Sequence, residues 1–112
     1  GGYGALMAAQ NAPDSFAGAA AVNPVFDVSC LYGTDYEPKP EYLFGEKEAL
    51  ASQGYALSTK FQIPVQLYCD ADHEEQARQW AQNGTQITVE TVSADNLLEE
   101  AFQKYVEGGI LV

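Results

Sequence analysis

The clearest strand in the sequence is the apolar run Ile63-Pro64-Val65-Gln66-Leu67-Tyr68-Cys69. Its proline stands at the strand entry, where no hydrogen bond of the sheet is lost. A helix follows, because Asp72 and Glu75 have the spacing of a capping box and Ala77, Trp80 and Ala81 form an apolar stripe behind them. Asn83-Gly84 ends this helix. Residues 63–84 therefore predict a strand joined to a helix.

The same alternation of elements continues toward the end of the sequence. Thr85 to Val92 alternates in polarity and is rich in β-branched residues, which predicts another strand. Asn96 and Glu99 repeat the capping-box spacing and begin a last helix. We expect a single apolar face on that helix, formed by Leu97, Leu98, Phe102, Tyr105 and Val106.

Before residue 63 the pattern predicts a helix, a strand and a long excursion. Residues 4–11 are helix formers, and Pro13 ends that helix. Phe16 to Val22 is a short apolar run that predicts a strand buried on both faces. The excursion covers about 24–60, has no sustained period, and contains one further predicted helix at 46–52.

This order of elements predicts an α/β fold. Helix, strand, excursion, strand, helix, strand and helix give a mainly parallel sheet of about three strands, joined by right-handed crossovers. Because helices flank such a sheet on both faces, we expect three layers. The 112 residues fit a single domain, 1–112, with the excursion as a loop or cap.

Composition argues against several classes of partner. Five Lys and Arg against 16 Asp and Glu give a net charge of −11, and the cations are scattered, so nucleic acid is not an expected partner. No run approaches the roughly 18 apolar residues of a membrane span, so a membrane is not expected either. Cys30 and Cys69 lack C-x-x-C spacing and are expected to be free thiols, which favours a cytoplasmic protein.

The first residues resemble a known family. GGYGALMAAQNAPDSFAGAAAVNPVFD resembles the nucleophile elbow, helix and buried strand of serine carboxylesterases with the α/β-hydrolase fold, particularly the esterase D and tributyrin esterase type. IPVQLYCDADH resembles the strand that ends in the triad acid of this family, and TQITVETVSADNLLEEAFQKYVE resembles its last strand and helix. The likeness spans the whole chain and the C-terminal half of the family, which implies a partial α/β-hydrolase fold.

The resemblance implies roles for individual residues. Gly1 is similar to the last glycine of the elbow and Gly2 is adjacent to it, which places the nucleophilic serine and an oxyanion donor before the sequence. Asp72 matches the triad acid, with Asp70 as the alternative because it stands at the same strand end. The turn that carries histidine in the family corresponds to Ser93-Ala94-Asp95-Asn96, which has none.

Other candidate residues have structural alternatives. His73 follows Asp72 in the first turn of a helix, so a solvent-facing position is expected rather than the role of catalytic base. The carboxylates around it could bind a divalent cation, but capping explains them, and we expect neither a metal nor a cofactor. An acyl pocket in the excursion competes with plain packing of a loop. The residues of that pocket would be Tyr32, Tyr36, Tyr42 and Phe44.

Two functions are consistent with these features. The resemblance implies hydrolysis of a small, short-chain ester by acyl transfer to serine, although this chain alone, lacking serine and the triad histidine, should not turn over ester. The alternative is a degenerate, non-catalytic hydrolase-like module for binding or assembly. In either case the first strand keeps an unpaired edge, so we expect a homo-oligomer or a complementary N-terminal segment to cover it.

Overall fold

The computed structural model describes residues 2–50, 52 and 54–107. These residues form two compact units. The first contains the residues up to Pro24 together with those from Ser58 onward, and the second is Val25–Leu57. The second unit corresponds to the excursion expected at about 24–60.

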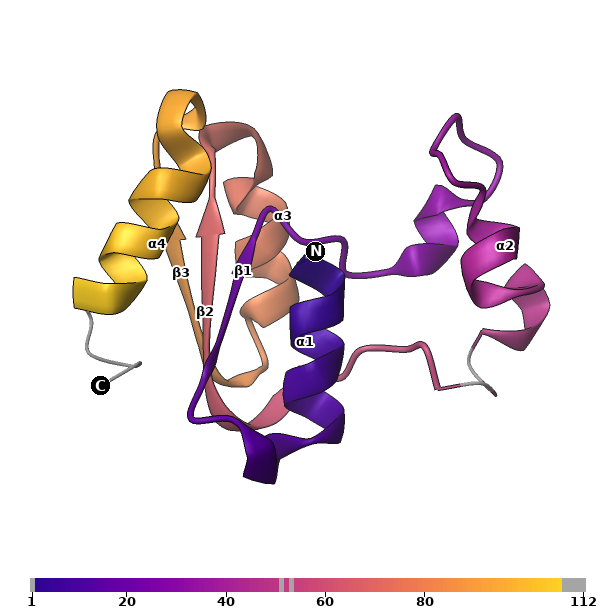
Figure 1. The fold of residues 1–112 in the computed structure, drawn as a ribbon, viewed down its shortest axis with the longest axis horizontal. Coiled ribbons are helices and arrows are strands. Elements are labelled where there is room, and N and C mark those ends of the chain that lie inside the picture. Colours follow the sequence, from indigo (N-terminus) through magenta and orange to yellow (C-terminus); the bar gives the residue numbers. More distant parts are fainter. Residues whose placement is uncertain (1, 51, 53, 108–112) are drawn as a thin grey trace. The chain divides into compact units, whose positions relative to one another are not determined.

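The first unit is built on a parallel sheet (Figure 1). Its strands are β1 (Ala19–Val22), β2 (Lys60–Cys69) and β3 (Thr85–Thr91), in that spatial order. Both pairings are parallel, and Ala21 and Val89 stand on either side of Leu67 in the register. The parallel α/β fold predicted from the order of elements is therefore confirmed.

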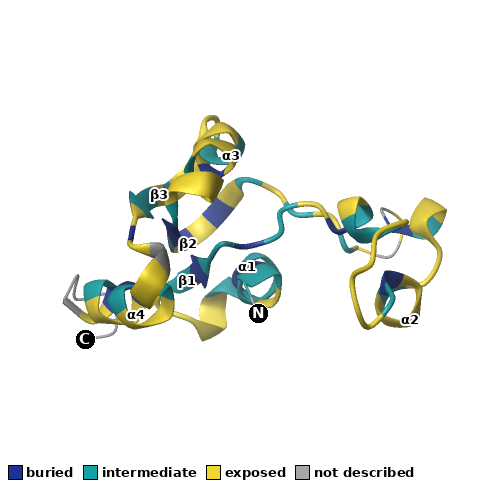
Figure 2. Ribbon diagram, turned by 90° about the horizontal axis from the view of Figure 1, so that it is seen from above, coloured by how far each residue is buried: buried dark blue, intermediate teal, exposed yellow. Residues whose placement is uncertain are grey.

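Helices cover both faces of this sheet (Figure 2). The helices α1 (Gly2–Asn11) and α3 (Ala71–Ala81) lie on one face, and α4 (Leu97–Glu107) lies on the other. Phe61 of β2 packs edge-to-face on Trp80 of α3, with ring centroids 6.2 Å apart. Alternation along a strand therefore turns the odd-numbered residues of β2 toward α1 and α3, and the even-numbered ones toward α4.

The two faces of the sheet have different cores. The α1/α3 face contains the most deeply buried side chains of the unit, among them Val65 and Leu67 of β2. On the α4 face a smaller cluster joins the strand ends to the helix. Its buried members are Tyr68, Val92, Ala101 and Tyr105.

The strands differ from prediction at their starts. β1 begins at Ala19 because a 3₁₀ turn, Pro13–Ser15, takes up the residues before it. Only Ala21 of β1 is buried, so the prediction of burial on both faces was wrong for this strand. β2 begins at Lys60, which places Pro64 inside the strand rather than at its entry. The pairing with β3 shifts register between Lys60 and Val65, where an irregular ladder accommodates the missing N–H.

The helix starts also differ from prediction. Asp70, not Asp72, caps α3: its side chain accepts hydrogen bonds from the backbone N–H groups of Asp72 and His73. At the last helix, a 3₁₀ turn, Ala94–Asn96, precedes α4, and Ser93 caps that turn in place of the predicted Asn96. The Glu100 carboxylate accepts a hydrogen bond from the Ser93 N–H at 2.8 Å, which holds the turn against the helix.

The apolar face predicted for α4 is split. Ala101 and Tyr105 are buried against the sheet, whereas Leu98, Phe102 and Val106 are 72%, 68% and 41% exposed. A helix that packs on one sheet buries a stripe about 100° wide, and the apolar residues of α4 span more than this. The predicted apolar residues therefore lie on one side of the helix, but the sheet covers only part of that side.

The second unit consists of short helices and turns. It contains α2 (Pro40–Phe44) and two 3₁₀ turns, Val28–Leu31 and Lys47–Ala49. The 3₁₀ turn Lys47–Ala49 is what remains of the helix predicted at 46–52. Phe44 and Tyr55 form an edge-to-face pair with ring centroids 5.1 Å apart.

Two predictions from composition can be compared with the structure. Both cysteines are free, as predicted, with Cys30 exposed and Cys69 buried at the end of β2. Burial raises the pKa of the Cys69 thiol. Within the described residues, no helix combines the length and the apolar character needed to cross a membrane.

Candidate functional site

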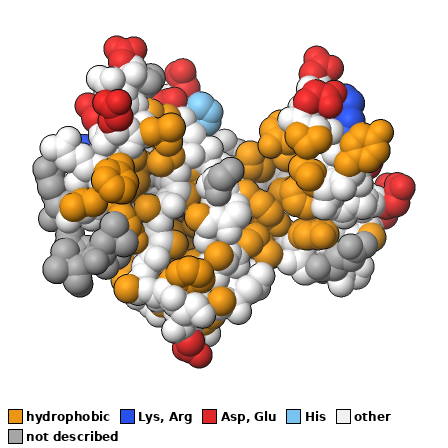
Figure 3. Space-filling view, in the orientation of Figure 1, with side chains coloured by type: hydrophobic (Ala, Val, Ile, Leu, Met, Phe, Trp, Pro, Cys, Tyr) orange, Lys and Arg blue, Asp and Glu red, His pale blue; other side chains and the backbone are white. Residues whose placement is uncertain are grey.

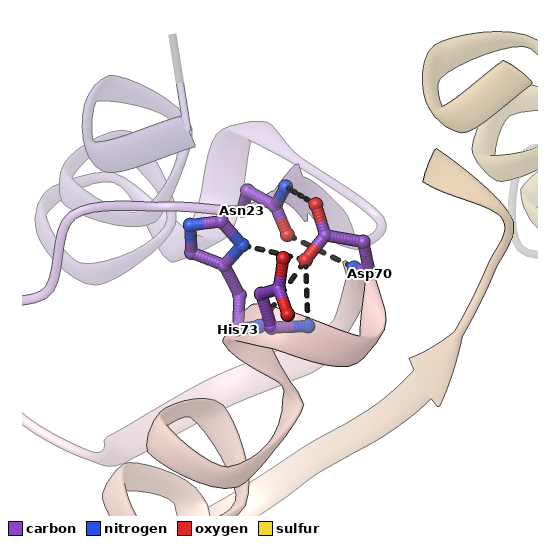
Figure 4. A network of polar contacts seen from close by, with 4 residues as sticks. Asn23, Asp70 and His73 are labelled. Carbon is purple, nitrogen blue, oxygen red and sulfur yellow. Dashed lines mark hydrogen bonds and ion pairs between the residues drawn. The ribbon is translucent and has the colours of Figure 1, made fainter. Parts of the chain in front are cut away.

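Three polar side chains meet where β1 and β2 end (Figure 4). Asn23 follows β1, Asp70 follows β2, and His73 lies in the first turn of α3. His73 Nδ1 is 2.6 Å from Asp70 Oδ1, and Asn23 Nδ2 donates to Asp70 Oδ2 at 3.0 Å. The carboxyl ends of parallel strands are where open α/β sheets commonly place their ligand sites. This cluster is therefore the candidate site.

Asp70 is the centre of the cluster. Its Oδ1 also accepts from the backbone N–H groups of Asp72 and His73, at 3.1 and 3.2 Å. The hydrogen bond from the His73 side chain, with a further one from Asn23, lowers the pKa of the Asp70 carboxyl in spite of its desolvation. The side chain is 15% exposed. Asp70 is thus an ionised carboxylate held in one position by several donors.

The imidazole of His73 is oriented by this carboxylate. Because an ionised carboxylate can only accept, the proton in the 2.6 Å contact lies on His73 Nδ1. In the neutral ring Nε2 then carries the lone pair, and Figure 4 shows this nitrogen pointing away from Asp70. The side chain is 51% exposed. A carboxylate that fixes the tautomer and direction of an imidazole is the arrangement by which a Ser-His-Asp triad orients its general base.

Asn23 connects the two strand ends. The side-chain Oδ1 of Asn23 accepts from the backbone N–H of Asp70 at 3.2 Å. The backbone N–H of Asn23 donates to the Tyr68 carbonyl at 3.0 Å. Its φ is 43°, in the left-handed region that asparagine tolerates better than most residues. Sequence reasoning missed Asn23, because its role depends on Asp70, which is 47 residues away.

The start of α1 lies beside the same strand end. A Cβ atom on Gly2 would be 2.8 Å from Cβ and 2.9 Å from Cα of Pro24, which directly follows Asn23. Only glycine permits this approach without a shift of backbone. The N-terminus of α1, the end of β1 and the Asp70–His73 pair are therefore neighbours in space.

Gly2→Ala should destabilise the protein by about 1 kcal/mol or more, because the new methyl group meets the backbone of Pro24. Gly4→Ala is the matched control in the same helix, since a Cβ there meets nothing within 4 Å. Alanine at position 4 should stabilise α1 by about 0.5–1 kcal/mol through helix propensity. Urea unfolding of both variants measures the effect, and equal changes in stability would contradict this account of Gly2.

The other residues assigned from the sequence lie as follows. Asp72 is exposed in the first turn of α3, and its backbone N–H bonds to Asp70. Gly1 lies outside the described residues. The turn after β3 is the capped 3₁₀ turn Ala94–Asn96. His73 is solvent-facing, as expected, but it also pairs with Asp70, a contact that the three-residue spacing could have indicated.

The aromatic residues of the expected acyl pocket belong to the second unit. The Tyr32 hydroxyl donates to the Gly45 carbonyl at 2.7 Å, which ties the loop to the end of α2. Phe44 packs on Tyr55, whereas Tyr36 and Tyr42 are 45% and 85% exposed. Packing within the unit accounts for Tyr32 and Phe44, and the Tyr42 ring faces solvent.

Comparison with known proteins yields no relative. The sequence matches no protein-family model, and no curated protein or solved structure matches the chain. Within the part of the chain that the structure describes, no three His, Cys, Asp or Glu side chains group as metal ligands would. The site is therefore interpreted from its own geometry.

Proposed function

We propose that this chain supplies the acid and base of a serine ester hydrolase of the α/β-hydrolase type. The observation that carries the proposal is the 2.6 Å contact between Asp70 Oδ1 and His73 Nδ1 at the carboxyl end of parallel strands. The neighbouring start of α1 supports it, because the resemblance places the nucleophilic serine two residues before Gly1. The acid is then Asp70, in place of Asp72, since Asp70 holds the imidazole.

The chemistry follows from this arrangement. His73 Nε2 accepts the proton of the serine hydroxyl while its oxygen bonds to the ester carbonyl carbon, and the carbonyl electrons move to oxygen. The imidazolium then returns the proton to the leaving alcohol as the C–O bond of the ester breaks. Water hydrolyses the acyl-serine by the same route. Asp70 stabilises the imidazolium, and the resemblance implies that the oxyanion donor lies next to the serine, before Gly1.

The chain of 112 residues should hydrolyse p-nitrophenyl acetate no faster than its urea-denatured form, because it carries no serine in a G-x-S-x-G setting. A protein extended by the residues encoded before Gly1 should be active. There, His73→Gln should lower kcat by about a thousandfold or more, while Asp72→Asn should leave it nearly unchanged. Turnover by the 112-residue chain that Asp72→Ala abolishes would overturn both the proposal and the assignment of Asp70.

A second candidate function is a non-catalytic module for binding or assembly. It is favoured by the turn after β3, where the resemblance implies a histidine and the structure has a 3₁₀ turn capped by Ser93. The codons before Gly1 discriminate between the two functions. A sequence other than G-x-S-x at that place would support the non-catalytic module.

We further propose that the protein acts in the cytoplasm. Its two free thiols support this, because oxidising compartments favour paired cysteines.

A further inference from the structure

The turn between α3 and β3 contains Asn83 and Gly84, at the end of the sheet opposite Asp70 (Figure 1). We propose that Asn83 is a site of spontaneous modification, at which the side-chain amide is lost as ammonia and both aspartate and isoaspartate are formed. This chemistry is independent of the proposed hydrolase, because the turn and the Asp70–His73 pair lie at opposite ends of the parallel strands.

The reaction needs only the two residues of the turn and water. The backbone nitrogen of Gly84 loses its proton and bonds to Cγ of Asn83, while the side-chain amide nitrogen leaves as ammonia. Proximity favours this step, because both groups belong to neighbouring residues and the product is a five-membered succinimide ring. Water then opens the ring at one carbonyl group to give aspartate, or at the other to give isoaspartate. Overall one water is consumed and one ammonia is released.

The side chain of Asn83 is free to react. It is exposed, and its amide makes no hydrogen bond to any residue that the structure describes. The contact that Asn83 does make uses its backbone carbonyl, which accepts from Nζ of Lys60 at 2.5 Å. A side chain that no partner holds can change rotamer, so Cγ of Asn83 can reach the next backbone nitrogen.

Packing requires a glycine directly after Asn83. A Cβ atom on Gly84 would be 2.6 Å from Cδ1 of Ile87 and 2.8 Å from the carbonyl oxygen of Thr59. The fold therefore places the least hindered attacking nitrogen beside Asn83. The N–H of Gly84 donates to the Ala81 carbonyl at 2.9 Å, but this hydrogen bond closes the end of α3, where opening costs little free energy.

The other asparagines lack this combination. Asn23 precedes Pro24, which has no N–H to lose, and its amide donates to the Asp70 carboxylate. Asn11 and Asn96 are exposed, but the residue after each has a Cβ atom that crowds the attacking nitrogen. Loss of the amide should therefore be selective for Asn83.

The two products should affect the fold differently. Aspartate adds one negative charge to a chain of net charge −11, and Figure 3 shows a face on which acidic side chains stand in groups and cationic ones are few. Isoaspartate instead lengthens the main chain by one methylene group. This extra group lies just before the N–H of Thr85, which donates to the Thr59 carbonyl at 2.9 Å. Isoaspartate, unlike aspartate, should therefore loosen the start of β3.

The test incubates the folded 112-residue chain in mildly alkaline buffer and follows the tryptic peptide 79–104 by tandem mass spectrometry. Replacement of the amide NH₂ by OH should be at least about tenfold faster at Asn83 than at Asn96, which lies in the same peptide. Chromatography should separate an isoaspartyl form from an aspartyl form. Asn83→Gln is the matched control, because its attack needs a six-membered ring and should be at least about tenfold slower.

Asn83→Asp supplies the aspartyl product directly for a second measurement. Hydrogen exchange at the Thr85 amide should be at least about tenfold faster in the isolated isoaspartyl form than in Asn83→Asp. Equal exchange in the two proteins would refute the effect on β3.

Three further results would overturn the site itself. Loss of the amide at Asn11 or Asn96 as fast as at Asn83 would show that the following glycine has no effect. Aspartate without isoaspartate would mean direct hydrolysis by water, with no succinimide. A reaction that occurs in urea but not in the folded chain would show that the hydrogen bond from Gly84 to Ala81 blocks the attack.

Discussion

Leu67→Ala is expected to lower the free energy of unfolding by about 3 kcal/mol. Leu67 is 0% exposed, in the central strand, with Ala21 and Val89 on either side in the sheet register. The loss combines the transfer of buried methyl groups with the cavity left behind, which neighbours in a sheet cannot collapse to fill. Chemical denaturation followed by circular dichroism measures the change.

Leu98→Ala is the matched control for this prediction. The substitution is the same, but Leu98 is 72% exposed on α4, so the cost in the 112-residue chain should be within about 0.5 kcal/mol. Equal losses for the two leucines in the 112-residue chain would contradict the placement of α4.

Asp70→Ala is expected to lower Tm by about 5 °C or more, since it removes the cap of α3 and leaves Asn23 and His73 without their shared acceptor. Asp72→Ala is the control, because the same change two residues later, in the first turn of the helix, removes an exposed carboxylate. Its Tm should stay within about 2 °C of the parent protein. Differential scanning calorimetry of both variants measures the effect, and a larger loss for Asp72→Ala would restore Asp72 as the cap.

The contribution of Asp70 should also depend on pH in one direction. Hydrogen bonds to the carboxylate lower its pKa in the folded protein below the unfolded value. The folded state is then favoured at pH values above the unfolded pKa, and the advantage is lost as the pH falls through the folded pKa. The Tm difference between parent and Asp70→Ala should therefore be constant near neutral pH and shrink below about pH 4. A difference that grows on acidification would contradict the assignment.

Secondary structure was predicted correctly where it depends on residues close together in the sequence. Strand β3 and the parallel order of the sheet follow from alternation, from β-branched residues and from helices placed between strands. The start of α3 was predicted wrongly at Asp72. Asp70 is the cap, because its carboxylate accepts from the backbone N–H groups of Asp72 and His73, and it also contacts Asn23 at the end of the neighbouring strand. That contact joins residues far apart in the chain, so local periodicity carries no sign of it.

The burial of individual side chains could not be predicted from the sequence, because it depends on which elements pack against each helix or strand. The apolar residues of α4 were recognised, but which of them face the sheet depends on how the helix lies over β1 and β2. The Asp70–His73 pair was within reach of sequence reasoning, since a spacing of three residues suits a helix start. Its position next to Gly2 was not, because that requires the approach of α1 to Pro24.

The two cysteines differ in their accessibility to thiol reagents. Cys30 is exposed in the second unit, and Cys69 is buried at the end of β2 with a thiol that burial keeps protonated. A maleimide fluorophore added to the folded protein therefore marks the second unit alone, and no substitution is needed to direct it there.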